Sequence, residues 1–379
     1  MPILALLFFV APQTQDAPEL ALHLQGDFRW RMEWRDLSGK RSHPASWRSR
    51  LSARGTPMPS LQVAAEWLTS IPTAGVPAKG SMSQAWAELE GFASSGARLR
   101  VGRFPLKAGE GRLLGRDDWS LFPRAFDGWA WSGGSSGKDW TLFSTSVAPF
   151  PGRSSGEDIL EGALGRWEDV APHTSLEGWL LRSGNEEDVR IMTAGLGLKN
   201  ELSSTLKAFL ESNAQGGEDQ GVSLKGSAAM GRMEWQLAPG HTLHLEHAFS
   251  SGDASGSGGR FRIIQPDSHV HHGFMDRFGA SNIKDTSIGW TGFSGRVWTW
   301  GFAHHRFRAH DSGQGAVSPS GGISPAGNGD FGREWDFHLR GSLDHGVAVD
   351  LGAAWLETGS GLPGEDGGLW FFTQFSLSF

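Results

Sequence analysis

The sequence predicts an all-β fold in which one antiparallel sheet closes into a transmembrane β-barrel. Segments that alternate apolar and polar residues recur along all 379 residues, and a two-residue period is typical of a strand with one wet and one apolar face. The chain has 54 Gly, 23 Phe and 18 Trp but no Cys. A secreted chain without disulfides needs another source of stability, such as a closed hydrogen-bonded sheet. Beyond the N-terminus, no apolar stretch approaches the roughly 20 residues of a membrane-spanning helix, so a membrane crossing would have to use strands.

Residues 1–17 are predicted to form a signal peptide. The apolar run 3–11 is too short to span a bilayer and matches the hydrophobic region of a secretory signal, with cleavage expected between Ala11 and Ala17. The alternative is a buried N-terminal strand, because no Lys or Arg precedes the run. No shift in composition marks a second domain, so residues 18–379 are predicted to form one barrel domain.

The first strong alternation is GDFRWRMEWRD at residues 26–36. Its apolar side chains are predicted to face lipid: Phe28, Trp30, Met32 and Trp34. Its charged side chains are predicted to face the lumen: Arg29, Arg31, Glu33 and Arg35. One wet face and one apolar face fit the wall of a barrel.

About 17 strands are expected in all, separated by Gly/Ser/Asp/Pro-rich connectors. Further alternating segments lie at 46–54, 61–68, 84–90, 97–104, 139–147, 189–198, 204–211, 221–235, 241–249, 286–293, 296–310, 333–343 and 346–357. Expected connectors are 132–138, 150–158, 212–221, 251–259 and 311–332. The competing fold is a soluble β-sandwich or propeller, but the second face carries too much charge for a packed interior. A water-filled lumen accommodates that charge.

The last segment, 369–379, places Phe371, Thr373, Phe375, Leu377 and Phe379 on one face. An alternating strand that ends in an aromatic residue resembles the C-terminal signature of bacterial outer-membrane barrels. The bacterial outer membrane is therefore the expected location.

Two stretches resemble a particular family, the alginate-export family of outer-membrane porins. In 99–131 the matching positions are Gly102, Arg103, Gly109, Gly111, Arg112, Leu113, Gly115, Asp118, Trp119, Arg124, Phe126, Asp127 and Gly128. In 271–290 they are Gly273, Met275, Asp276, Asn282 and Asp285. The resemblance implies a barrel of 18 strands, with 16 as the alternative even number. A further strand near 156–168 or 259–265 would complete the 18. It also implies passive export of alginate, an anionic polyuronate, through an arginine-lined pore.

The 99–131 connection is predicted to fold into the lumen and form a constriction, because Arg112, Arg116 and Arg124 stand there among acidic residues such as Asp118 and Asp127. Strand arginines are predicted to extend this cationic track: Arg29, Arg31, Arg48, Arg50, Arg54, Arg98, Arg100 and Arg103. Arg306, Arg308 and Arg340 are predicted to add to it from the other side of the lumen. Arginine binds carboxylate through two parallel hydrogen bonds. The alternative is that the strand arginines form structural ladders along the barrel wall.

The expected function is a passive channel for an anionic saccharide or small anionic solutes. A weakly selective general porin is one alternative, and a secreted carbohydrate-binding β-protein is another of a different class. The net charge of −7 gives no sign of nucleic-acid binding. No nucleophile motif points to an enzyme, no cofactor is expected, and HVHHG at 269–273 lacks the spacing of a zinc site. We expect a monomer, in contact with outer-membrane lipid and an anionic solute; periplasmic export partners stay open.

Overall fold

The computed structural model describes residues 22–37, 39–71, 77–148, 159–185, 189–295 and 297–379. The predicted signal peptide lies outside these residues. In the described part of the chain, no helix is long and apolar enough to cross a membrane.

Nearly all of the regular structure is β-strand. The first ten strands are β1 (Leu22–Leu37), β2 (Lys40–Ser42), β3 (Ala45–Met58), β4 (Leu61–Ile71), β5 (Lys79–Glu90), β6 (Arg98–Phe104), β7 (Phe126–Ser135), β8 (Lys138–Val147), β9 (Ile159–Ala171) and β10 (Thr174–Gly184). The remaining ten are β11 (Val189–Glu201), β12 (Leu206–Asp219), β13 (Val222–Leu224), β14 (Ser227–Ala238), β15 (His241–Ser250), β16 (Ile283–Ser294), β17 (Trp298–Arg308), β18 (Asp330–Ser342), β19 (Val347–Thr358) and β20 (Gly368–Ser378). Two short 3₁₀ turns, η2 (Ser268–Val270) and η3 (Asp344–Gly346), lie in connections.

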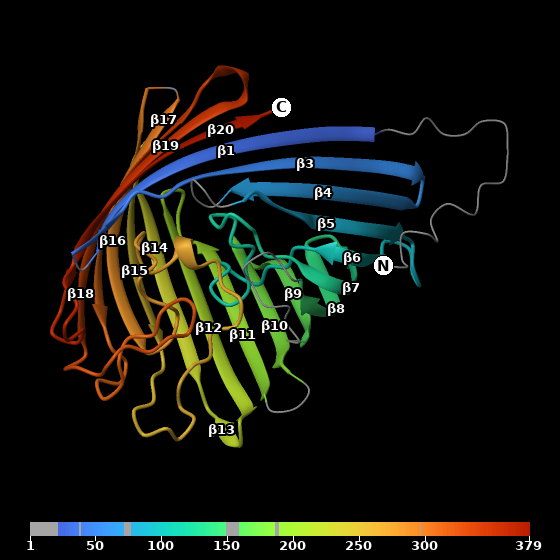
Figure 1. Ribbon diagram of the computed structural model, residues 1–379. Helices are drawn as coiled ribbons and strands as arrows, with labels where there is room; N and C mark the ends of the chain where they lie inside the picture. The colour runs from blue at the N-terminus through green and yellow to red at the C-terminus, as the bar shows by residue number, and fades with distance from the viewer. Residues whose placement is uncertain (1–21, 38, 72–76, 149–158, 186–188, 296) are drawn as a thin grey trace, which may run out of the picture.

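The sheet closes on itself into an 18-strand antiparallel barrel (Figure 1). Strand β1 pairs with β20 from Asp27↔Ser378 to Leu37↔Gly368, so no edge is left open. The two three-residue strands do not add to the count, because β2 pairs with β1 just ahead of β3 and β13 pairs with β12 just ahead of β14. Closure gives the backbone N–H and C=O groups of every strand hydrogen-bond partners within the sheet, as a lipid environment requires.

The predicted fold class is therefore confirmed, and the alternatives of 16 strands and of a soluble β-protein are wrong. The strand expected near 156–168 is β9. Residues 259–265 lie in a connection instead.

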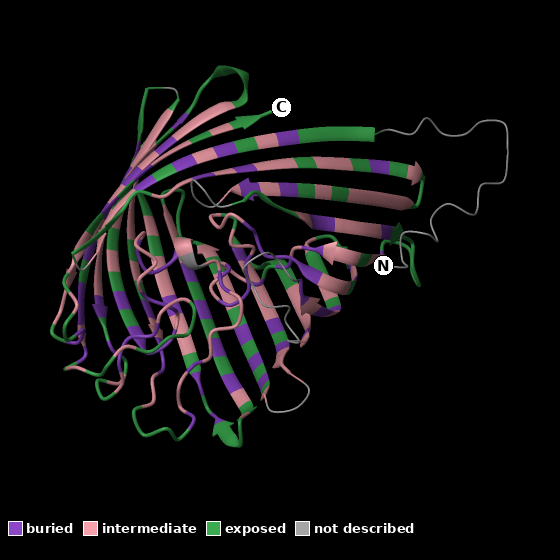
Figure 2. Ribbon diagram, viewed as in Figure 1, coloured by how far each residue is buried: buried purple, intermediate pink, exposed green. Residues whose placement is uncertain are grey.

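Successive residues alternate in burial along many of the strands, as the banded strands of Figure 2 show. On β1, Arg29, Arg31 and Glu33 are each 6% exposed, whereas Phe28 and Met32 are 40% and 48% exposed. Trp30 and Trp34 lie on the same outer face, where their rings pack against Phe375 and Phe371 of β20. The predicted faces of residues 26–36 and of the last strand are confirmed.

Two expected connectors, 132–138 and 212–221, are mostly strand, with turns that occupy only 136–137 and 220–221. The glycines in these segments led to the prediction of loops. In the structure they make room in the sheet for large neighbouring side chains. A Cβ at Gly133 would lie 2.8 Å from the ring of Trp140 on the neighbouring strand. The missing side chain leaves room for the indole, and this explains why Gly and Trp are both abundant.

The long connections gather at one end of the barrel, and short turns lie at the other, where both terminal strands have their free ends. Residues 105–125, 251–282 and 309–329 form three of the long connections. In outer-membrane barrels short turns are periplasmic and long loops extracellular, so the long-loop end is the extracellular end.

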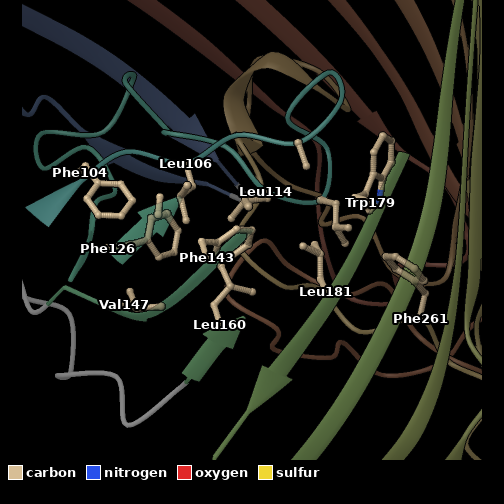
Figure 3. Packing of buried hydrophobic residues seen from close by; sticks show 13 residues of the cluster. Phe104, Leu106, Leu114, Phe126, Phe143, Val147, Leu160, Trp179, Leu181 and Phe261 are labelled. Atoms are coloured by element: carbon tan, nitrogen blue, oxygen red, sulfur yellow. The ribbon is translucent and has the colours of Figure 1, made fainter. Parts of the chain in front are cut away.

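The 105–125 connection, called here the crossing loop, runs across the barrel interior (Figure 1), as the sequence predicted for 99–131. Its Leu106, Leu113 and Leu114 are at most 8% exposed and pack against the inner wall of β6–β10. Figure 3 shows wall residues around them, among them Phe104 and Phe126. Burial of apolar area at about 25 cal/mol per Å² attaches this side of the loop to the wall.

Candidate functional site

Arginines of β1 and β3 hold the crossing loop by its backbone. Arg29 donates to the carbonyl oxygens of Asp118, Trp119 and Ser120 at 3.0, 3.0 and 3.1 Å. Arg48, which stands opposite Arg29 in the register, donates to those of Asp118 and Ser120 at 3.0 and 2.9 Å. Guanidinium donors are rigid forks that suit several acceptors at once.

These arginines point into the lumen as predicted, but they are covered by the loop. Arg29 is 6% exposed and Arg48 only 2%. Arg31 is similarly buried and lies over the indole of Trp119, with 3.8 Å between its guanidinium carbon and the ring centre. The expectation that they line an open pathway is corrected: in this arrangement they anchor the loop.

Trp119 of the family motif projects from the crossing loop and packs against β20. Its ring stacks on His269 at a centroid distance of 3.8 Å and 9° between planes. The rings of Trp370 and Phe372 meet it edge-on at 5.9 and 5.0 Å. Such aromatic contacts add rigidity beyond their buried area.

Three charged groups on this side of the lumen keep access to water: Arg50, Arg116 and Asp118. Arg50 pairs with Asp27 at 2.5 Å and with Asp118 at 3.0 Å. Arg116 lies 3.6 Å from Glu66 and 3.8 Å from Asp118, and the side chains of Arg116 and Asp118 are 36% and 51% exposed. The structure thus brings together the predicted Arg50, Arg116 and Asp118.

The carboxylate of Asp118 stays ionised in this setting. Partial burial alone would raise the pKa of Asp118, but Arg48, Arg50 and Arg116 favour the charged form and hold the pKa below its usual range. The site is therefore a mixed cluster with guanidinium groups in excess.

Arg100 and Arg98 continue along β6 toward the short-turn end. Arg100 pairs with Glu88 at 2.7 Å and lies 4.4 Å from the ring centre of Trp86. Its side chain remains 31% exposed. Arg98 is exposed at the end of the strand. Their part in a solute track stays a prediction.

Arg124 is a buried clamp between two connections. It donates to the carbonyl oxygens of Gly115, Gln265 and Pro266 at 3.1, 2.8 and 2.6 Å. The backbone bond from Gly115 N–H to the Gln265 carbonyl, 2.8 Å, lies beside it. The family-motif residue Gly111 serves the same junction: it has φ +86° and its carbonyl accepts from Asp267 N–H. Arg124 fastens the crossing loop to the 251–282 connection.

Arg112 connects the loop to the far wall. It pairs with Glu246 of β15, and the neighbouring Arg232 of β14 pairs with Glu110 of the loop at 2.8 Å. With Arg29 and Arg48 on β1 and β3, the crossing loop is tied to opposite sides of the barrel.

Arg103 and Asp127 lie on the outer side of the wall, so their prediction as pore residues is wrong. They form a two-pronged pair at 2.7 Å for each contact. Their strand neighbours Phe104 and Phe126 take the inward positions and are 1% and 0% exposed beneath the loop. Because successive residues alternate faces, the inward phenylalanines turn the charged pair outward.

The later motif has a structural role. Asn282, with φ +50°, donates its amide to the carbonyls of Asp311, Gln314 and Gly315 at 2.9–3.2 Å. It thereby joins the 251–282 and 309–329 connections. Asp276 pairs with His269 at 3.0 Å. Among the described residues, no three His, Cys, Asp or Glu side chains form a potential metal site.

Sequence reasoning missed a cavity of about 490 Å³ beside the crossing loop. It is lined by residues of both charge signs and by aromatic rings, among them Lys107, Glu110, Arg166, Glu177, Trp179 and Lys199. Several lie on β9 and β10, a region not singled out as alternating. The alternating pattern of β9 and β10 is weak in the sequence because glycines interrupt the apolar positions. The signal that could have been used is the pair Arg166 and Glu177, which stand opposite each other on the inner face.

Comparisons with known proteins agree with this architecture. A family model described as alginate export matches residues 77–367. No curated protein sequence matches the chain. Among solved structures, OccK5 (OpdH) of Pseudomonas aeruginosa has a TM-score of 0.72 at 11% identity over 94% of this chain and 98% of that one. OpdL of the same organism has a TM-score of 0.71 at 16% identity over 95% and 99%.

A third similar structure is OccK2 (OpdF) of P. aeruginosa in complex with glucuronate, with a TM-score of 0.70 at 16% identity over 95% of this chain and 97% of that one. These likenesses support the barrel fold. The family model covers more than half of the chain, and its family consists of channels and not of enzymes. With a closed barrel and an apolar outer face, the chain is a bacterial outer-membrane channel that belongs to the alginate export family.

Proposed function

We propose that the channel passes anionic saccharides or small anionic solutes of the uronate type, which contact Arg50, Arg116 and Arg100. The observation that carries the proposal is the excess of guanidinium groups where the crossing loop meets β1 and β3. The cationic groups there are Arg29, Arg31, Arg35, Arg48, Arg50 and Arg116; the anionic groups in contact with them are Asp27, Glu33, Glu66 and Asp118.

The arginines divide into two roles. The buried Arg29, Arg31 and Arg48 do not reach a solute, but their charge contributes to the local potential, because fixed charges act beyond their contacts. Arg50, Arg116 and Arg100, whose side chains are 17%, 36% and 31% exposed, offer donors to a passing carboxylate. Asp118, shared among several arginines, competes for the same donors. Binding strong enough to admit a solute and weak enough to release it is what conduction requires.

Two comparisons support the solute class. The family is described as alginate export, and alginate is a polyuronate. The OccK2 (OpdF) structure holds glucuronate, a single sugar carboxylate. Both concern carboxylated sugars.

The test is block of single-channel current by uronate oligomers in planar bilayers. Replacing both arginines that contact Asp118 and keep access to water (Arg50→Gln with Arg116→Gln) should weaken block about tenfold or more, because each charge-assisted hydrogen bond contributes about 1.5–3 kcal/mol. The matched control is Arg340→Gln, since Arg340 faces the lumen from β18 near the short-turn end, away from the crossing loop, and its side chain is 65% exposed.

Block that is unchanged in the double variant, or weakened equally by Arg340→Gln, would remove these arginines from the pathway. Neutral oligosaccharides of the same length should block weakly and equally in all variants. A wild-type channel blocked by neither oligomer would be the weakly selective porin of the alternative hypothesis.

A further inference from the structure

The outer wall of the barrel carries charged side chains near its long-loop end. On strands β6, β7, β9 and β10 these charges form pairs of opposite sign. Arg103 pairs with Asp127 at 2.7 Å across β6 and β7. Arg182 of β10 pairs with Glu161 of β9 at 2.8 Å. Paired charges of this kind lower the cost of placing ions next to lipid.

Strands β16, β17 and β18 differ. Lys284, Arg306, Arg308 and Arg333 form an external basic patch on three adjacent strands. They point outward because their strand neighbours Asp285, Phe307 and Glu334 are buried on the inner face, at 1%, 0% and 0% exposure. The prediction that Arg306 and Arg308 face the lumen is therefore wrong. In the register Lys284 stands opposite Arg308, and Arg306 opposite Arg333.

The patch is only half neutralised. Arg306 pairs with Asp330 at 2.8 Å, and Arg333 pairs with Glu357 at 2.5 Å. Lys284 and Arg308 are exposed, and neither makes a hydrogen bond or ion pair with any residue within the described ranges. Like charges directly opposite each other on neighbouring strands are destabilising. Arg306 and Arg333 have acidic partners, and Asp330, which stands opposite Arg308 in the register, is the partner of Arg306. The Lys284–Arg308 pair therefore calls for an anion from outside the chain.

The position of the patch identifies the source of that anion. Toward the middle of the barrel, the same outer faces of β16, β17 and β18 carry Trp290, Phe302 and Phe337, each more than 40% exposed. An apolar band of this kind faces the hydrocarbon of the membrane, and the cations above it lie at the level of the headgroups. The neighbouring connections, 251–282 before β16 and 309–329 after β17, belong to the extracellular end, so the leaflet is the outer one.

We propose that Lys284, Arg306, Arg308 and Arg333 bind the phosphate groups of an anionic glycolipid in the outer leaflet. Clusters of basic side chains at the membrane surface attract anionic headgroups. Arg308 has a free guanidinium fork, which matches phosphate oxygens through two parallel hydrogen bonds, and Lys284 supplies a point charge opposite it. A phosphate between them offsets the repulsion that the register imposes.

The test compares lipid retention by the full chain in phospholipid vesicles that contain bisphosphorylated lipid A or the same lipid stripped of both phosphates. After detergent extraction and washing, bound glycolipid is counted per barrel by native mass spectrometry. The wild type should retain the phosphorylated form in preference to the stripped form. The pair Lys284→Gln with Arg308→Gln should lower that retention by roughly tenfold.

Arg182→Gln is the matched control, because Arg182 also faces outward but is paired with an acid; it should retain lipid as the wild type does. Heat-modifiable gel mobility verifies that each variant is folded, and Lys284→Ala with Arg308→Ala provides a second neutral pair. Equal retention of both lipid forms by the wild type, or undiminished retention by either folded double variant, would overturn the proposal. Complete displacement of the lipid by inorganic phosphate at millimolar concentration would also overturn it, because the site would then be a free-phosphate site.

Discussion

Arg124→Ala should raise the single-channel conductance and its fluctuations. Arg124 joins the crossing loop to the 251–282 connection through three backbone carbonyls. Its removal takes this donor away from all three, although the Gln265 carbonyl keeps the N–H of Gly115. Each carbonyl left buried without a donor costs about 1–3 kcal/mol. The loop then separates from that connection and narrows the lumen less. Current recordings of wild type and variant in the same bilayer measure the change.

Arg124→Lys separates geometry from charge in this experiment. Lysine retains the positive charge but lacks the planar fork that reaches several carbonyls together. We expect a conductance between those of the wild type and Arg124→Ala. A conductance equal to wild type in Arg124→Ala would mean that the constriction does not depend on this clamp.

Leu180→Arg should sharply reduce the folded fraction in membranes. Leu180 lies in the middle of β10, faces outward and is 59% exposed. An arginine on the lipid face near the bilayer midplane costs about 2–4 kcal/mol. The folded fraction is read from heat-modifiable mobility after reconstitution into vesicles.

Leu180→Phe is the control for this position, since it keeps the side chain apolar and should fold as the wild type does. If Leu180→Arg folded equally well into vesicles, the outer face of β10 would not be the lipid-facing side of the barrel.

The sequence predicted the two faces of β1 and β20 correctly, because side-chain direction in a strand has a period of two and the two faces differ strongly in polarity. The same reasoning failed at Arg103 and Asp127. Periodicity separates two sets of residues but does not say which set faces inward when one set holds charges and the other holds Phe104 and Phe126. The apolar side of the crossing loop decides it, because it packs on those phenylalanines.

The partners of the inward arginines were also beyond the reach of sequence reasoning. Arg29 binds carbonyls about ninety residues away in the chain, and backbone acceptors carry no sequence signal. Arg29 and Arg48 hold the backbone of a loop and do not form a ladder along the wall. The path of the crossing loop through the lumen determines which groups these arginines bind.

The cavity beside the loop was missed for a local reason. On β9 and β10, Gly162, Gly165 and Gly178 occupy strand positions that would otherwise display an apolar side chain. The alternation is therefore interrupted in sequence, although the strands are continuous in the sheet. Large neighbouring side chains fill these places: a Cβ at Gly165 would lie 2.5 Å from the ring of Trp167.

The central claim, that the cationic cluster makes this an anion pathway, is tested most directly by the reversal potential of the wild-type channel. The measurement uses a planar bilayer with a tenfold gradient of potassium chloride. We expect a reversal potential with the sign of the chloride equilibrium potential. Its magnitude would reach about 59 mV for ideal selectivity for a monovalent ion. A reversal potential of zero, or one with the sign of the potassium equilibrium potential, would contradict the claim.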